Sequence, residues 1–238
     1  KVPDEKGIRR KTYLMAFLDD STRMILWAKF AFSDNAILFE QGLKHIFKCH
    51  GRIGKVYVDN GASFVSGQTS RILRILGVPL IHSRPYKPAG RGKIERFFRT
   101  VRGSFLCFLE PDSIKSLEDL NLRFRTWLET EYHRTPHKGL LGKTPLEAKL
   151  KNASKIIAVD PSVDLNKAFL HQESRKVYND NTLTLYSRLY EVPGILAGKK
   201  VELLFDPIHP NELLIIHENR EYGFAKPVQT YANTRVKR

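Results

Sequence analysis

The chain has 238 residues and a formal net charge of +15, because it contains 40 Lys and Arg residues and 25 Asp and Glu residues. Apolar residues make up 42% of the chain and aromatic residues 11%, enough to bury a core and too many for a disordered chain. No apolar run approaches the ~18 residues that span a bilayer, and the polar start of the chain is no secretory signal. The two cysteines, Cys49 and Cys107, make no disulfide framework, which favours a reducing, intracellular setting.

The first part of the chain reads as strands followed by a helix. Residues 12–32 predict a β-hairpin, since two apolar runs flank the turn sequence Asp-Asp-Ser-Thr-Arg at 19–23. A helix is expected over 36–49, where apolar residues keep helical spacing after a capping Ser-Asp-Asn. A short buried strand is expected at 55–58, and it ends at Asp-Asn-Gly, residues 59–61.

Helices and strands alternate in the next part. The pattern predicts a helix around 72–76, a strand over 78–82, a loop rich in Pro and Gly, and a helix from about Lys93 to Phe108. Cys107 lies between apolar neighbours and is expected to be buried.

Two capping signals follow. Ser116 is expected to cap a helix, and Thr144-Pro145 predicts another helix start, since proline suits the first helical position. Strands, then strands alternating with helices, indicate an α/β fold with a mixed sheet flanked by helices.

The pattern changes after residue 150. Turn signals then recur at short intervals and separate short apolar segments, which predicts a small all-β barrel. The expected organisation is an α/β domain over 1–150, a linker over 151–172 and a β-barrel over 173–238.

The positive charge is concentrated. Residues 71–102 hold nine basic side chains and one acidic one, Glu95, so they carry +8 of the +15. This density favours nucleic acid as the partner. A basic helix on a membrane surface is the competing interpretation.

Two carboxylates are candidates for metal-dependent phosphodiester chemistry, which needs carboxylates that converge on hard cations. Asp59 follows a buried strand, where ligand sites of α/β sheets collect. Glu95 is expected in the first turn of a helix, whose positive end favours a carboxylate. Each residue alone is commonly structural, since Asp-Asn-Gly is an ordinary turn and acids are frequent in a first helical turn. Asp59 and Glu95 have 35 residues between them.

The amino-acid sequence around Asp59 and Glu95 resembles the integrase catalytic core of insertion-sequence transposases and retroviral integrases. The matching segments are Val56 to Phe64, with Asp-Asn-Gly-Ala-Ser-Phe, and Ser83 to Arg96, with Pro-Tyr-Lys-Pro and Gly-Lys-Ile-Glu-Arg. The resemblance covers about residues 8–150, and residues 175–201 look like the small β-barrel of phage Mu-type transposases. It implies an RNase H-like fold, three catalytic carboxylates and two Mg²⁺ (or Mn²⁺) ions.

The first carboxylate of that pattern is not evident in this sequence. The hairpin at 12–32 aligns with the second and third strands of the family, so the first strand and its Asp are expected to lie ahead of Lys1. Asp20 is the alternative stand-in, although Asp19 and Asp20 read as turn residues. On this interpretation the 238-residue chain is a fragment that is inactive by itself.

The resemblance implies a DNA transposase that cleaves DNA and transfers strands, with Asp59 and Glu95 as catalytic residues and metal ligands. Its implied partners are double-stranded transposon ends and target DNA, and a homo-multimer in the bacterial cytoplasm, on the nucleoid, with no membrane contact. The alternatives are a catalytically silent DNA-binding or assembly protein derived from a transposase, and an RNase H-type nuclease. The basic residues expected on the DNA are Arg84, Lys87, Arg91, Lys93, Arg96, Arg99 and Arg102.

Overall fold

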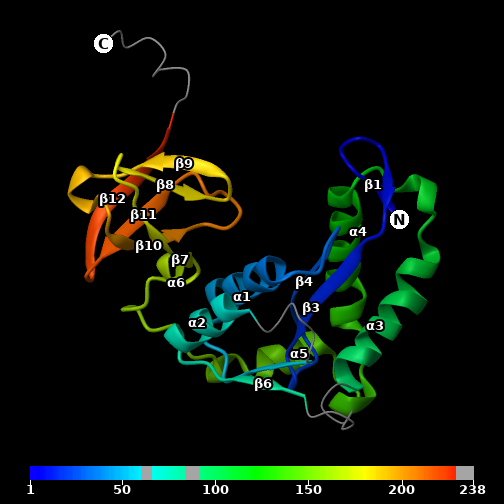
Figure 1. Cartoon of the computed structure of the whole chain (residues 1–238). Helices are drawn as coiled ribbons and strands as arrows, with labels where there is room; N and C mark the ends of the chain where they lie inside the picture. Colours follow the sequence, from blue (N-terminus) through cyan, green and yellow to red (C-terminus); the bar gives the residue numbers. More distant parts are fainter. Residues whose placement is uncertain (60–65, 84–91, 229–238) are drawn as a thin grey trace. The chain divides into compact units, whose positions relative to one another are not determined.

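The computed structural model describes residues 1–59, 66–83 and 92–228 (Figure 1). The chain divides into two compact units, Lys1–Leu165 and Asn166–Arg238. No helix of the described residues is long and apolar enough to cross a membrane.

The first unit contains strands in pairs. Strands β3 (Tyr13–Leu18) and β4 (Ile25–Ala31) form the predicted antiparallel hairpin, and β5 (Val56–Val58) lies parallel to β6 (Leu80–His82). A third, two-residue pair joins β1 (Val2–Pro3) to β2 (Arg9–Arg10). Antiparallel and parallel pairing therefore occur in one unit, as predicted, but the strands of the described residues form three separate pairs instead of one continuous sheet.

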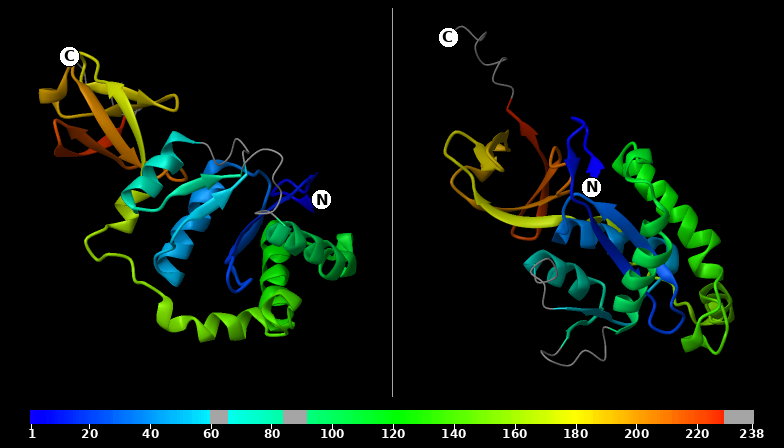
Figure 2. Two further views of the ribbon diagram at one scale, coloured as in Figure 1. Left: turned by 90° about the horizontal axis from the view of Figure 1, so that it is seen from below. Right: turned by 90° about the vertical axis from the view of Figure 1, so that its right-hand side faces the viewer.

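Helices lie beside these strands (Figure 2). Several begin at caps that the sequence predicts: the Ser116 hydroxyl accepts a hydrogen bond from the Asp119 N–H at 3.1 Å, and Thr144 forms a capping box with Glu147. The α-helices of this unit are α1 (Ala36–His50), α2 (Gly67–Ile75), α3 (Gly92–Ser104), α4 (Leu117–Thr130) and α5 (Pro145–Lys151). Helix α6 (Leu165–Ala168) begins at the last residue of the first unit and continues into the second.

Helix α1 packs closely on the β3–β4 hairpin at Gly42. A Cβ atom at this position would stand 2.5 Å from Phe17 Cε2 and 2.7 Å from Trp27 Cε3. Only glycine therefore fits here without movement of both rings.

Aromatic side chains build the core between the hairpin, α3 and α4. Phe30 of the hairpin lies 5.0 Å from Phe124 of α4, and Phe97 of α3 lies 5.0 Å from Tyr132, both edge to face. Phe97 and Phe124 are each 1% exposed. This core fixes the position of α3, which carries Glu95.

Two sequence predictions about the end of α3 are wrong. The helix ends at Ser104 instead of Phe108, and a short 3-10 turn, Leu106–Phe108, follows it. Cys107 is exposed on that turn, where its thiol donates to the Gly103 carbonyl at 2.7 Å. The tighter turn rotates the apolar run 105–108 so that Phe105 is buried while Cys107 and Phe108 face solvent.

The second unit is a nearly closed, barrel-like antiparallel sheet with strand order β7-β10-β11-β12-β9-β8. Its interior is apolar and includes Leu183, Tyr190, Val201, Leu203 and Phe205, each at most 1% exposed. The strands are β7 (His171–Lys176), β8 (Thr182–Leu185), β9 (Arg188–Glu191), β10 (Lys200–Phe205), β11 (Leu213–His217) and β12 (Arg220–Pro227).

His133 ties the loop after α4 to the hairpin. Its ring is 1% exposed, and Nε2 accepts a hydrogen bond from the Ile25 N–H at 3.3 Å. A Glu129 carboxylate oxygen lies 3.3 Å from Nδ1. The pKa of His133 lies below its ordinary value because burial disfavours the charged ring, an effect that Glu129 partly offsets.

The neutral state of His133 predicts a stability that falls in mild acid. Since the folded pKa is lowered, the stabilisation is complete above the unfolded pKa of about 6.5 and is lost as pH falls through the folded pKa. His133→Gln should therefore flatten the decrease in unfolding free energy between about pH 7 and pH 5. Urea unfolding followed by tryptophan fluorescence measures this, because Trp27 and Trp127 both lie in the first unit. The exposed His82→Gln variant should keep the wild-type pH dependence.

Candidate active site

Asp59 directly follows β5, at the carboxyl end of the β5–β6 pair. The Ser83 N–H donates to the Val58 carbonyl at 2.8 Å, so the two strands remain paired up to this edge. Asp59 is half-buried. The structure therefore places this carboxylate where the carboxyl ends of parallel strands meet, a common position for ligand-binding residues.

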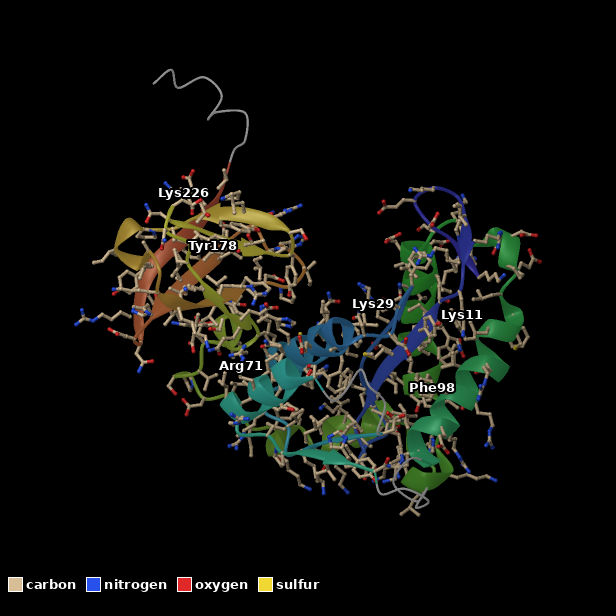
Figure 3. The ribbon with its side chains drawn as sticks, viewed as in Figure 1. Lys11, Lys29, Arg71, Phe98, Tyr178 and Lys226 are labelled. Carbon is tan, nitrogen blue, oxygen red and sulfur yellow. The ribbon has the colours of Figure 1, made fainter. Side chains whose placement is uncertain are left out.

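Glu95 lies in the first turn of α3, and its side chain is exposed. The buried face of the helix carries Phe97 and Val101. Phe98, labelled in Figure 3, is half-buried and its ring lies 5.7 Å from that of Phe97. Packing thus holds the helix while the carboxylate remains accessible to solvent.

An ion pair joins the start of α3 to the hairpin turn. Lys93 Nζ lies 2.6 Å from each carboxylate oxygen of Asp20. Asp19 instead accepts hydrogen bonds from Ser21 and Thr22 within the turn. Asp19 therefore has the turn role that the sequence indicates, and the Asp20 carboxylate is engaged by a lysine. This exposed ion pair contributes at most about 1 kcal/mol, so its main effect is to orient Lys93.

The predicted basic residues divide into three groups. Lys93 and Arg96 line a hollow beside the start of α3. Arg99 and Arg102 lie on exposed positions further along the helix. Arg84, Lys87 and Arg91, like the turn residues Asn60 and Gly61, lie outside the described residues.

The donor chemistry of Asp59 and Glu95 suits a hard divalent cation, because such ions prefer carboxylate oxygens. Residues 1–59, 66–83 and 92–228 contain no group of three or more His, Cys, Asp or Glu side chains that could hold a metal ion.

A groove follows α3 away from Glu95. One hollow of about 330 Å³ is lined by residues that include Arg23, Lys93, Arg96 and His137. A larger one of about 680 Å³ also includes Arg96 and His137 and extends to Phe108. Sequence reasoning did not assign Arg23 or the hollow, because the lining residues come from three distant segments.

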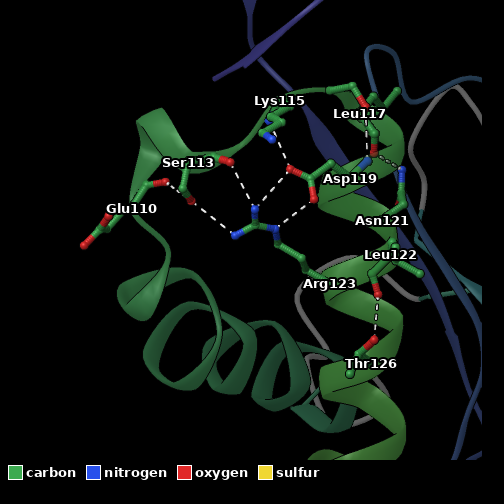
Figure 4. Close-up of polar contacts among 10 residues, drawn as sticks. Glu110, Ser113, Lys115, Leu117, Asp119, Asn121, Leu122, Arg123 and Thr126 are labelled. Carbon is green, nitrogen blue, oxygen red and sulfur yellow. Dashed lines mark hydrogen bonds and ion pairs between the residues drawn. The ribbon is translucent and has the colours of Figure 1, made fainter.

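Arg123 of α4 is hydrogen-bonded to residues near the start of its own helix and in the preceding segment (Figure 4). Its guanidinium donates to the Asp119 carboxylate at 2.8 Å and to the Ser113 carbonyl at 3.0 Å. The hydrogen bond from Arg123 is the main reason that the pKa of Asp119 lies below its ordinary value. The segment between α3 and α4 is thereby attached to α4.

Known families match the part of the chain that holds this site. Residues 29–110 match the TnsB C-terminal domain, and residues 76–145 match the integrase core domain. The transposase for transposon Tn552 of Staphylococcus aureus is 31% identical to the chain over 154 residues. The chain is therefore similar to transposases and integrases over these residues. The alignment with the Tn552 protein covers 58% of this chain and 32% of that relative, so the chain spans about a third of the relative's length.

A solved structure supports the fold. The crystal structure of the catalytic core domain of BIV integrase matches this chain with a TM-score of 0.50 and 16% identity. The match covers 61% of this chain and 90% of that domain. The predicted α/β, RNase H-like fold is therefore confirmed.

Proposed function

We propose that this chain is the catalytic part of a DNA transposase that cleaves DNA and transfers the freed strand to a target. The main support is the position of the two carboxylates, Asp59 after β5 and Glu95 in the first turn of α3, within residues that match transposase and integrase families. The similarity to the Tn552 transposase supports DNA as the substrate.

In this proposal Asp59 and Glu95 hold two Mg²⁺ (or Mn²⁺) ions together with a third carboxylate. Such ions stabilise the charge that develops on a phosphodiester and lower the pKa of a bound water. The protein has three tasks: to present the carboxylates, to orient α3 through its aromatic core and the Lys93–Asp20 pair, and to hold DNA phosphates with Arg96, Arg99 and Arg102.

Cleavage and joining are each in-line displacements at phosphorus. A water attacks the phosphodiester at the transposon end and releases a 3′-hydroxyl, which leaves the phosphate on the flanking 5′ end. That hydroxyl then attacks a target phosphodiester and displaces the 3′-oxygen of the target strand, which leaves as a 3′-hydroxyl. No step needs a covalent bond to the protein. We further propose that the protein acts as a homo-multimer on paired DNA ends in the bacterial cytoplasm. In this proposal the β-barrel unit contributes to assembly or contacts the DNA ends.

Metal dependence and product type test this function. The natural full-length protein is incubated with DNA carrying the ends of its own element and a target plasmid, with Mg²⁺ or with EDTA. Joined DNA that forms only with Mg²⁺ is the expected result. Cleavage without joined product would favour the RNase H-type nuclease. Binding of the ends without any cleavage in Mg²⁺ or Mn²⁺ would favour the silent DNA-binding protein.

A further inference from the structure

Four of the six residues that line the 330 Å³ hollow beside α3 have basic or imidazole side chains. The six residues are Arg23, Gly92, Lys93, Arg96, His137 and Gly139. They come from the hairpin turn, the first turn of α3 and the loop after α4. Glu95 stands in the same first turn of α3, within about 5 Å along the helix axis of the residues that line the hollow.

Arg23 has an unfavourable backbone conformation and a buried nitrogen without an acceptor among the described residues. Its backbone has φ 61°, a left-handed conformation that disfavours a non-glycine residue by about 1 kcal/mol. Guanidinium nitrogen Nη1 is buried, and no acceptor of the described residues bonds to it. A buried donor without an acceptor costs about 1–3 kcal/mol, and more when it is charged. The Tyr132 hydroxyl, which donates to the Arg23 carbonyl at 3.2 Å, helps to hold the residue in place.

The other terminal nitrogen of Arg23 lies toward the wall of the hollow. Nη2 is 3.8 Å from the point where a Cβ of Gly139 would stand, and Gly139 lines the hollow. A larger residue at Gly139 would narrow the space between Arg23 and His137. The glycine therefore keeps room beside the guanidinium.

Among the described residues, neither arginine of the hollow has an acidic partner in an ion pair. Lys93, in contrast, is paired with Asp20. The exposed Arg96 side chain lines both hollows of the groove. Two arginines that share one small space repel each other unless an anion joins them.

His137 adds a donor to the same space. Its Nδ1 accepts a hydrogen bond from the Gly139 N–H at 3.2 Å, so the neutral ring carries its proton on Nε2. The pKa of His137 lies below its ordinary value, first because of burial and then because of the nearby charges of Arg23 and Arg96. The positive charges of the two arginines therefore contribute to the lowered pKa of His137.

Such a set of donors matches an oxyanion with several acceptor oxygens, and arginine in particular suits phosphate. We propose that the hollow between Arg23, Arg96 and His137 is a phosphate-binding site, occupied by a backbone phosphate of the DNA strand that passes Glu95. The identity of the occupant rests on the proposed function, and nucleic acid is favoured over an acidic peptide because basic residues continue along α3 from this point.

Inorganic phosphate tests the site without DNA. Calorimetric titration of the chain with phosphate at low salt should show binding that Arg23→Gln and Arg96→Gln each weaken by about 10- to 100-fold. Arg125→Gln, an exposed arginine on α4 with the same charge change, should bind phosphate like the wild type. Arg96 is exposed, so its variant gives a result even if Arg23→Gln does not fold. Equal phosphate affinity in the wild type and in Arg96→Gln would overturn the site.

DNA binding tests the occupant. Fluorescence anisotropy with a labelled duplex at several salt concentrations gives the slope of log affinity against log salt. The slope should fall by about one in Arg96→Gln and Arg23→Gln and remain unchanged in Arg125→Gln. Phosphate binding with unchanged DNA slopes would overturn DNA as the occupant. A wild-type chain that binds phosphate but no DNA would contradict the proposed function and leave the anion site in place.

Discussion

Glu95→Gln is expected to abolish joined DNA product while DNA binding and folding survive. The substitution keeps the shape of the side chain and removes the charge that the proposed metal site needs. A metal ion contributes several kcal/mol to stabilisation of the transition state, so the rate of joining should fall by about 10³-fold or more. Because Glu95 is exposed and lies outside the aromatic core, the unfolding free energy should change little. Asp59→Asn should have an effect of the same size on joining.

Glu118→Gln provides the matched control for Glu95→Gln. Glu118 is also an exposed glutamate in the first turn of a helix, α4, and so has the same interaction with the helix dipole. The control should retain wild-type joining, measured by gel analysis of strand-transfer products from the natural full-length protein. If Glu95→Gln joins DNA at the rate of Glu118→Gln, Glu95 is not part of the catalytic centre.

Local signals predicted most elements of the first unit. Ser116 and Thr144 each cap a helix through a hydrogen bond with the residue three positions ahead, so sequence spacing is enough to predict both helix starts. The β3–β4 hairpin has its turn chemistry and both apolar strands within 20 residues. The position of α3 along the chain was also predictable, although its end was not.

Elements with weak local signals escaped prediction. Strand β7 has the sequence His-Gln-Glu-Ser-Arg-Lys and no apolar residue, and it forms because it pairs with β10 along its whole length. Strand β9 buries only Tyr190 and pairs with β8 and β12. Pairing with distant strands, rather than local propensity, decides such segments.

In the candidate site, too, some residues could be predicted from local sequence while others depend on contacts between distant segments. Spacing and surrounding motif predicted Asp59 and Glu95 as candidates, since one follows a strand and the other lies in a helix with a clear sequence pattern. Arg23 read only as part of a turn. Its relation to Arg96 and His137 arises when the hairpin turn, α3 and the loop after α4 fold together, and no sequence spacing encodes that proximity.

Phe124→Ala is expected to cause the largest loss of stability in the first unit. The ring is 1% exposed and lies 5.0 Å from Phe30 and 5.1 Å from Phe105, with Trp127 stacked at 5.8 Å. Removing a buried phenyl ring leaves a cavity and costs about 3–5 kcal/mol. Phe124→Leu keeps most of the volume and should cost clearly less.

Urea unfolding followed by tryptophan fluorescence measures this loss, with Leu122→Ala as the control on the same helix. Leu122 is 63% exposed, so its truncation should change the unfolding free energy by no more than about 0.5 kcal/mol. A loss below about 1 kcal/mol for Phe124→Ala would contradict the packing described for α3 and α4. Because α3 rests on this core through Phe97 and Val101, loosening the core should also weaken the DNA-dependent functions proposed for Glu95 and Arg96. The folded Phe124→Ala protein should then join DNA more slowly than its loss of stability alone explains.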